Sequence, residues 1–378
     1  MLIRVETENG LVGYAPGEGS EKARDGIECD VAPFLEGRLL ADPDALRIQF
    51  LEGPAKYAAN LLRLYCLVEI ALYDLLGKSL GIPVSELLGG RVRDHITLYG
   101  SAGMYMRPQE YADEAAAIAG LGFRAYKMRP GIGPDQDLEA VRLMRQAVGP
   151  DFDLMVDGHT WWRMGDRSYG PGEVQRMARQ LGEWDVAWLE EPLPPEDHAG
   201  YRELRRAGHV AIASGEHEPD EAGFLDLIST RCVDYVQMDI LCQGGYPGAR
   251  RLFPEIEHAN LRFAFHSWGT ALEVMAAAQL GVCWPENLVE WLEYPCYSHG
   301  GKPGIYPFPL ADEILMHPLQ IEHGDLIVPR SPGLGVEVNE GVIEQYPWLP
   351  GPWSYFHIDS PAQTKAVTSD HSEQWYGK

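Results

Sequence analysis

The chain has 378 residues, enough for two domains or one large domain, and its 45% hydrophobic and 23% charged residues are typical of a globular protein. Its formal net charge of −25 disfavours nucleic acids and anionic membranes as partners, because both attract proteins through clustered Lys and Arg. No apolar run approaches the ~20 residues of a membrane helix. The six cysteines lack a CxxC pair, which favours reduced thiols in a cytoplasmic protein over a disulfide framework.

The first 93 residues are expected to form a hairpin followed by helices. Apolar and polar residues alternate at the start, and Asn9-Gly10 is typical of a hairpin turn. From about residue 30 to 90 the apolar residues recur at helical spacing. One stripe of a long predicted helix contains Leu64, Leu67, Val68, Ala71, Leu72 and Leu75.

A different pattern follows, in which short apolar strands alternate with longer amphipathic segments. Eight strands are expected, at residues 96–100, 124–129, 152–158, 186–192, 210–217, 235–240, 262–267 and 287–293. Strands that alternate with helices predict right-handed βαβ units and a parallel sheet. An open, doubly wound sheet is the alternative to a closed barrel, but its usual phosphate loops, GxxxxGK(S/T) and GxGxxG, are absent. We therefore predict an α/β fold with a closed barrel.

Ionisable residues stand at the carboxyl ends of seven successive predicted strands, 23 to 33 residues apart. In order they are Lys127 with Arg129, then Asp157, Glu190, Glu216, Asp239, His266 and Glu290. The catalytic groups of parallel barrels lie at these strand ends. A single charged residue there is usually the solvated start of a loop, whereas seven in succession predict one functional site.

Three of these strand ends are carboxylates: Asp157, Glu190 and Glu216. Carboxylates that converge raise one another's pKa unless a cation lies among them. A hard divalent ion with oxygen ligands, Mg²⁺, is the simplest such cation. The alternative is that each carboxylate forms a separate salt bridge. We favour the metal site.

Two histidines are candidates for proton transfer. Asp239 and His266 end neighbouring strands, and a carboxylate on one imidazole nitrogen makes the other nitrogen a better base. His159 lies two residues beyond Asp157 and is expected on the same side of the strand end. His217 directly follows Glu216, so strand parity turns it away and predicts a structural role. A buried structural histidine is the alternative for His266 as well.

These motifs together resemble the enolase superfamily, in particular its mandelate racemase and muconate lactonizing enzyme branch. "VDGH", "WLEEP" and "SGEH" resemble the three metal-ligand strand ends of that branch, and "MDILCQGG" and "AFHSWGT" resemble its Asp–His dyad. "ALYDLLGKSLGIPVSELLGG" is similar to the segment that enters the barrel, and "PGLGVEV" to the one that leaves it. The resemblance implies a modified TIM barrel, (β/α)₇β-like, at 94–316. It also implies an α+β capping domain formed by residues 1–93, short at its start, and by the returning segment 317–378.

The resemblance also implies a first chemical step. Mg²⁺ and a basic residue would bind a substrate carboxylate, a base would remove the α-proton, and the metal would stabilise the enediolate. Lys127 in "YKMRP" matches the first position of the branch's KxK motif, and Glu290 is assigned to the acid of the last strand. Arg129 stands where the racemases have Lys. Arg remains protonated at any working pH and is a poor proton acceptor.

The predicted reaction is the Mg²⁺-dependent dehydration of an acid sugar. His266 would be the base and His159 the acid, since "DGH" resembles the galactonate-type dehydratases. The product would be a 2-keto-3-deoxy sugar acid. A racemase or epimerase of a 2-hydroxy acid is the alternative, which Arg129 disfavours as a second base, and a non-catalytic protein that binds sugar acids is a third. The partner is then a small anionic sugar acid, and a homo-oligomer is expected.

Overall fold

The computed structural model describes residues 1–346 except 59, 105, 242 and 297–309. Eight parallel strands pair in chain order, and the last pairs with the first, so the barrel is closed. The strands are β3 (His95–Met104), β4 (Ala125–Arg129), β5 (Asp153–Asp157), β6 (Val186–Glu190), β7 (Ile212–Ser214), β8 (Tyr235–Met238), β9 (Arg262–Phe265) and β10 (Val289–Pro295). Closure confirms the predicted α/β barrel and rules out the open sheet.

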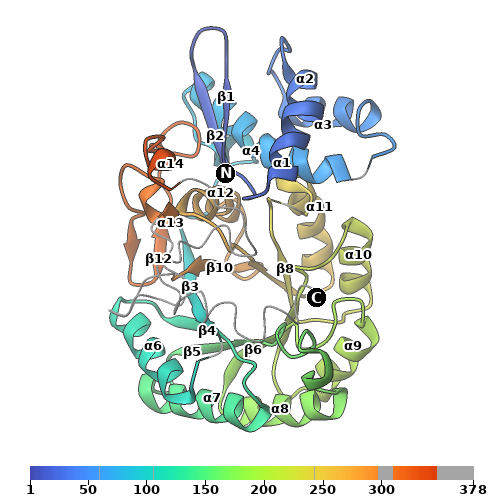
Figure 1. Ribbon diagram of the computed structural model, residues 1–378, viewed down its shortest axis with the longest axis vertical. Coiled ribbons are helices and arrows are strands. Elements are labelled where there is room, and N and C mark those ends of the chain that lie inside the picture. Colours follow the sequence, from blue (N-terminus) through green and yellow to red (C-terminus); the bar gives the residue numbers. More distant parts are fainter. Residues whose placement is uncertain (59, 105, 242, 297–309, 347–378) are drawn as a thin grey trace.

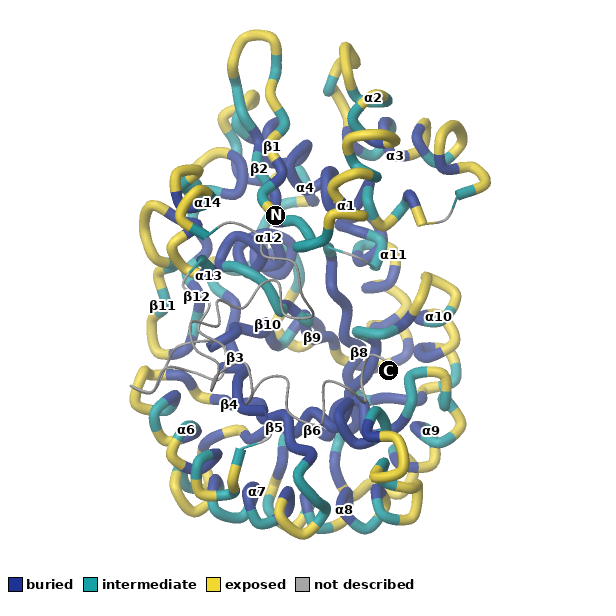
Figure 2. Tube along the Cα trace, in the orientation of Figure 1, coloured by how far each residue is buried: buried dark blue, intermediate teal, exposed yellow. Residues whose placement is uncertain are grey.

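Each connection between consecutive strands contains a helix, which gives the (β/α)₇β pattern. The helices are α6 (Pro108–Gly120), α7 (Pro134–Val148), α8 (Pro171–Glu183), α9 (His198–Ala207), α10 (Glu221–Ser229), α11 (Gly245–His258) and α12 (Ala271–Gly281). In α8 the buried residues are Val174, Met177, Ala178 and Leu181, one stripe at helical spacing. Figure 2 shows the consequence, because the strands are dark blue and the outer faces of α6–α10 are largely yellow.

The barrel interior is filled by side chains and is not a pore. Every strand contributes one inward residue to a layer that combines large aromatic rings with alanines. Its members are Tyr99, Ala125, Met155, Trp188, Ala213, Tyr235, Ala264 and Trp291. Because this layer closes the barrel, polar side chains that point inward nearer the carboxyl ends of the strands face a single rim.

The N-terminal residues form the cap drawn in blue in Figure 1. Its hairpin joins β1 (Leu2–Glu6) and β2 (Val12–Pro16), and Gly10 in the turn has φ +83°, which favours glycine. Helical segments follow: α1 (Glu21–Gly26), η1 (Ile27–Val31), α2 (Ala32–Leu35), α3 (Pro43–Glu52), α4 (Asn60–Leu80) and α5 (Val84–Leu87). The long helix α4 packs against β2 and against α11 of the barrel.

The segment after the barrel returns to the cap. It contains α13 (Leu310–Glu313), β11 (Ile321–Glu322), β12 (Asp325–Ile327) and α14 (Val342–Gln345), and β12 pairs antiparallel with β3. The Val84 amide donates to the Gly333 carbonyl at 2.8 Å, and the Leu334 amide donates to Asp74 at 2.7 Å. The Trp- and Tyr-rich tail, residues 347–378, lies outside the described residues. The exact boundaries at 93 and 316 stay a prediction. No helix among the described residues has the length and apolar character needed to span a membrane.

Candidate active site

The rim at the carboxyl ends of the strands brings together all but one of the predicted strand-end residues. Lys127 and Arg129 lie on β4, Asp157 and Glu190 are the last residues of β5 and β6, and Glu216 lies two residues after β7. Asp239 and His266 directly follow β8 and β9. Most of these charged side chains are almost completely buried, Lys127, Asp157 and Glu190 at 0% exposed. A buried charge requires an ion-pair or hydrogen-bond partner.

Glu290 is the exception, and its predicted place at the rim is wrong. It lies near the start of β10, where it accepts hydrogen bonds from Tyr235 Oη and Arg262 Nη1, both at 2.7 Å. Those two residues begin β8 and β9, so Glu290 sits at the amino end of the barrel. The prediction chose the wrong acid of the last strand, because Glu290 is the second residue of β10, which continues to Pro295.

Glu293 occupies the position at the rim instead. Its Oε1 lies 3.1 Å from Lys127 Nζ and 2.8 Å from Arg129 Nη2, and its Oε2 accepts from the Ser267 amide at 3.0 Å. Burial by itself would raise the pKa of Glu293, but Lys127, His266 and Arg129 outweigh it and lower the pKa to about 2. Strand parity agrees with this placement, because Glu293 lies two residues beyond the inward-facing Trp291, but it is the structure that shows which face of the strand points inward.

The carboxylates of Asp157 and Glu216 form a small buried cluster with His159. One possible ligand atom from each of the three lies within 4.8 Å of the others. Asp157 Oδ2 and Glu216 Oε2 are buried and accept no hydrogen bond from any residue that the structure describes. Arg129 Nε and His266 Nε2 lie 3.3 and 2.9 Å from these oxygens, as ion pairs without hydrogen-bond geometry. Oxygens of this kind fit a hard divalent cation, so the cluster could bind a metal ion.

Glu190 lies beside this cluster with its oxygens already engaged. It pairs with Asp157 in the β5–β6 register, yet its Oε1 is 2.5 Å from Lys127 Nζ. Its Oε2 accepts from Trp188 Nε1 at 3.0 Å and from Gln237 Nε2 at 2.8 Å. Burial raises the pKa of Glu190 to about 8. Its role as a third metal ligand therefore stays a prediction.

Glu191, the second acid of "WLEEP", stabilises the loop that follows β7. It accepts hydrogen bonds from the amides of Gly215 and His217 at 3.4 and 3.3 Å, and so holds the end of β7. Its Oε2 is 2.6 Å from His217 Nδ1, while His217 Nε2 contacts Arg163. Both ring nitrogens of His217 are thus engaged, which agrees with a structural role. Glu191 was not among the predicted site residues.

The predicted dyad is assembled at the rim. His266 Nδ1 lies 3.0 Å from Asp239 Oδ2, and His266 Nε2 lies 2.9 Å from Glu216 Oε2 and 3.7 Å from Glu293 Oε2. Burial alone would lower the pKa of His266, but the surrounding carboxylates, Glu216 first, raise it well above its usual value. A cation beside Glu216 would remove much of that attraction and leave Asp239 to orient the ring.

His159 contacts the same carboxylate cluster from the end of β5. Its Nδ1 is 2.7 Å from Asp157 Oδ1, and its amide donates to the same oxygen at 3.1 Å. The side chain is buried, and its ring centroid is 6.3 Å from that of His217. The structure therefore brings one imidazole from β5 and one from β9 to the same group of carboxylates.

The cationic side chains at the rim are rigidly held. Arg129 Nη1 donates to Ser101 Oγ at 2.8 Å, and the guanidinium lies 3.9 Å from the centroid of the Trp268 ring. Burial would lower the pKa of Lys127 and of Arg129, but the carboxylates around them, Glu190 for Lys127 and Glu293 for Arg129, raise both pKa values. Both side chains stay protonated, as the prediction for Arg129 requires.

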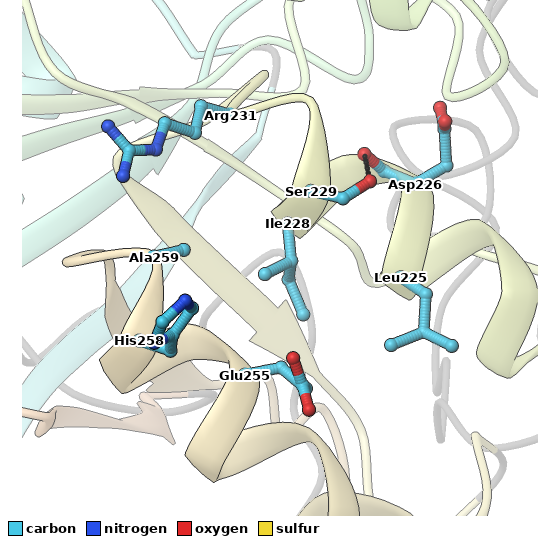
Figure 3. Close-up of a pocket in the computed structure, with 8 residues that line it drawn as sticks. All are labelled: Leu225, Asp226, Ile228, Ser229, Arg231, Glu255, His258 and Ala259. Carbon is cyan, nitrogen blue, oxygen red and sulfur yellow. Dashed lines mark hydrogen bonds between the residues drawn. The ribbon is translucent and has the colours of Figure 1, made fainter.

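A surface depression elsewhere carries none of these residues. It lies between α10 and α11 and is lined by Leu225, Asp226, Ile228, Ser229, Arg231, Glu255, His258 and Ala259 (Figure 3). These residues belong to the carboxyl-terminal ends of the two helices, which precede β8 and β9. The depression is therefore at the end of the barrel opposite to the rim.

Residues 110–342 match the family described as enolase C-terminal domain-like, and residues 1–89 match the mandelate racemase/muconate lactonizing enzyme N-terminal domain. The chain therefore belongs to the enolase superfamily. Within it, the chain is a member of the mandelate racemase/muconate lactonizing enzyme family and an enzyme.

Proteins similar to this chain include a dehydratase and two cycloisomerases by name. The chain is 28% identical to D-xylonate dehydratase of Haloferax volcanii, over 92% of this chain and 85% of that protein. It is 26% identical to D-galactarolactone cycloisomerase of Agrobacterium fabrum, over 92% of this chain and 90% of that protein. The crystal structure of 3,6-anhydro-D-galactonate cycloisomerase from Zobellia galactanivorans is 31% identical and superimposes with a TM-score of 0.79, covering 91% of this chain and 93% of that one.

Proposed function

We propose that the protein is a Mg²⁺-dependent acid-sugar dehydratase, a lyase. The observation that carries this proposal is the pair of imidazoles, His159 from β5 and His266 from β9, in contact with one buried carboxylate cluster. Dehydration requires one group to take the α-proton and another to protonate the departing β-hydroxyl. The similarity to a D-xylonate dehydratase supports the same substrate class, a small anionic sugar acid.

The ion would be held by Asp157 and Glu216, with Glu190 as the third proposed ligand. When bound, Mg²⁺ would neutralise the substrate carboxylate and the negative charge that grows on it as the α-proton leaves. Lys127 and Arg129 would add fixed positive charge to the same carboxylate, since their side chains are buried and held at the rim.

The histidines would carry the protons. His266 Nε2 would accept the α-proton, while Asp239, 3.0 Å from Nδ1, fixes the tautomer and stabilises the imidazolium. His159 would then give a proton to the β-hydroxyl, which leaves as water because hydroxide is a poor leaving group. The resulting enol becomes the 2-keto-3-deoxy sugar acid.

Two other reactions start from the same proton abstraction. A racemase or epimerase would need a second base on the opposite face of the substrate, and Arg129 cannot serve because it stays protonated. A cycloisomerase would open or close a ring in place of releasing water, as the names of two relatives indicate for those proteins. A screen of mono- and diacid sugars with Mg²⁺, read by keto-acid formation and by NMR of the products, distinguishes the three. A cytoplasmic location and a homo-oligomeric assembly also remain predictions from the sequence.

Removal of divalent metal is expected to abolish turnover. EDTA treatment followed by dialysis should leave a folded but inactive enzyme, and Mg²⁺ should restore activity. Asp157→Asn should weaken Mg²⁺ binding steeply, because Glu216 would lose its partner ligand in the cluster. Isothermal titration calorimetry measures the affinity. Full turnover by a metal-free preparation would contradict the proposed chemistry.

His159→Asn is expected to separate the two proton transfers. The variant should still exchange the substrate α-proton with D₂O, because His266 and Asp239 remain. It should lose most keto-acid formation, about 10²–10⁴-fold, since that is the usual contribution of a positioned acid. NMR of the exchange beside a keto-acid assay measures both. If His159 only binds a substrate hydroxyl, KM would rise while kcat stays nearly constant, and the assignment as acid would fail.

A further inference from the structure

The side chain of Gln243 links two of the loops that form the rim. It lies in the connection between β8 and α11, four residues after Asp239. Its Nε2 lies 2.7, 3.0 and 2.9 Å from the carbonyl oxygens of Gly215, Glu216 and Glu218. Its Oε1 accepts from the Asp239 amide at 2.8 Å. One side chain therefore ties the loop of the proposed ligand Glu216 to the loop of the proposed dyad.

The chemistry of these contacts requires an amide. The three carbonyl oxygens only accept hydrogen bonds, so they must face the –NH₂ group, while the Asp239 amide only donates and must face the oxygen. Glutamate has the same shape but would put an oxygen against three carbonyls. Asparagine is one methylene shorter. Gln243 therefore makes a set of hydrogen bonds that neither glutamate nor asparagine could make at this position.

The backbone that follows Gln243 is also held in place. Gly244 and Gly245 follow with φ +109° and +66°, values that favour glycine and turn the chain into α11. Arg47 of the capping helix α3 donates from Nη2 to the Gly244 carbonyl at 2.8 Å, and its Nη1 pairs with buried Glu69 at 2.8 Å. The loop is thus held by the cap as well as by the barrel.

We propose that Gln243 is a positioning residue that sets the separation between Glu216 and Asp239. Both carboxylates contact His266, Glu216 at Nε2 and Asp239 at Nδ1, so the two loops that Gln243 joins define the position of this ring. A fixed separation keeps Glu216 aimed at the proposed metal and Asp239 aimed at Nδ1. This inference rests on the proposed function, because it assigns Gln243 to the same metal and base.

The chain offers a matched control in Gln279 of α12. Its Oε1 accepts from the Ser85 amide at 3.1 Å, and its Nε2 donates to the Leu334 carbonyl at 3.0 Å. It therefore joins a capping helix to the returning C-terminal segment with the same kind of contacts as Gln243. It contacts none of the proposed metal ligands or dyad residues. If both glutamines only stabilised the fold, substitution of either one should have the same effects.

The test compares Gln243→Glu with Gln279→Glu in the full-length protein. We expect Gln243→Glu to weaken Mg²⁺ binding by calorimetry about 10–100-fold, the usual effect of losing a group that orients a metal ligand. Its amide hydrogen exchange should rise at residues 215–218 in the metal-free protein. Gln279→Glu should lower the thermal midpoint and leave Mg²⁺ affinity within about twofold. Gln243→Met, which removes all four contacts without adding charge, carries the same comparison if the first variant does not fold.

The possible outcomes separate the positioning role of Gln243 from the proposed function. Wild-type Mg²⁺ affinity and wild-type amide exchange in a folded Gln243 variant would overturn the positioning role and leave the proposed function intact. Equal losses of Mg²⁺ affinity in the Gln243 and Gln279 variants would also overturn it, because they would show a general loss of stability. If the wild-type chain binds no Mg²⁺, the proposed function fails, and this role of Gln243 fails with it.

Discussion

His266→Asn is expected to abolish both α-proton exchange into D₂O and keto-acid formation. His266 lies at the end of β9, and its Nδ1 is held by Asp239 at 3.0 Å. Asparagine keeps a polar group of similar size but cannot accept a proton at neutral pH. In the proposed reaction the α-proton leaves before the β-hydroxyl, so loss of the base should stop both exchange and product formation. NMR exchange and a keto-acid assay, run on the same sample, measure the two losses.

Asp239→Asn is the companion variant. It should leave the fold intact and lower the rate, because the ring loses the charge that orients it and stabilises its protonated form. The exchange and product rates should fall together. Normal turnover in His266→Asn would reject His266 as the base, whatever the effect of Asp239→Asn.

Glu293→Gln is expected to lower kcat/KM by about 10² or more, since displacement of binding groups by about 1 Å has effects of that size. The Glu293 carboxylate contacts Lys127, Arg129 and the Ser267 amide, so it positions both cations at the rim. The amide of Gln preserves the shape, but in either orientation its –NH₂ group faces a donor, the two cationic side chains on one side or the Ser267 backbone amide on the other. Steady-state kinetics with the substrate from the screen measures the effect.

Glu290→Gln is the matched control on the same strand. Glu290 pairs with Arg262 at the opposite end of the barrel, where its side chain is 25% exposed. A partly exposed pair of this kind contributes about 1 kcal/mol or less to stability, and no effect on kcat/KM beyond about twofold is expected. A large loss of activity in Glu290→Gln with little loss in Glu293→Gln would overturn the placement of the acid at Glu293.

Much of the fold could be predicted because the βα pattern is periodic. Each predicted strand in the barrel region corresponds to a strand of the structure, since apolar runs bounded by amphipathic helices have few other ways to bury their side chains. The same regularity predicts that strand ends meet at one rim. Asp157, Glu216, Asp239 and His266 are found there for that reason.

Other features depended on contacts between segments far apart in the chain. Glu290 and Glu293 are both acids of the last strand, and only the register of β10 against β3 and β9 decides which one reaches the rim. Gln243 lies within "MDILCQGG", but the motif does not reveal its contacts, because these are made with three carbonyl oxygens on the neighbouring β7 loop. Glu190 looked equivalent to Asp157 and Glu216, yet Lys127 lies 2.5 Å from it.

The sequence by itself determined the class of fold, the order of the ionisable residues along the rim and the presence there of His159 and His266, because these follow from local periodicity and spacing. The tertiary structure alone decided which acid of β10 joins the site, which carboxylate oxygens find no hydrogen-bond donor among the described residues and which side chain holds the two loops. The physical reason is that strand register and hydrogen-bond satisfaction are set by partners distant in sequence. A local pattern specifies where a side chain can point but not what it meets there.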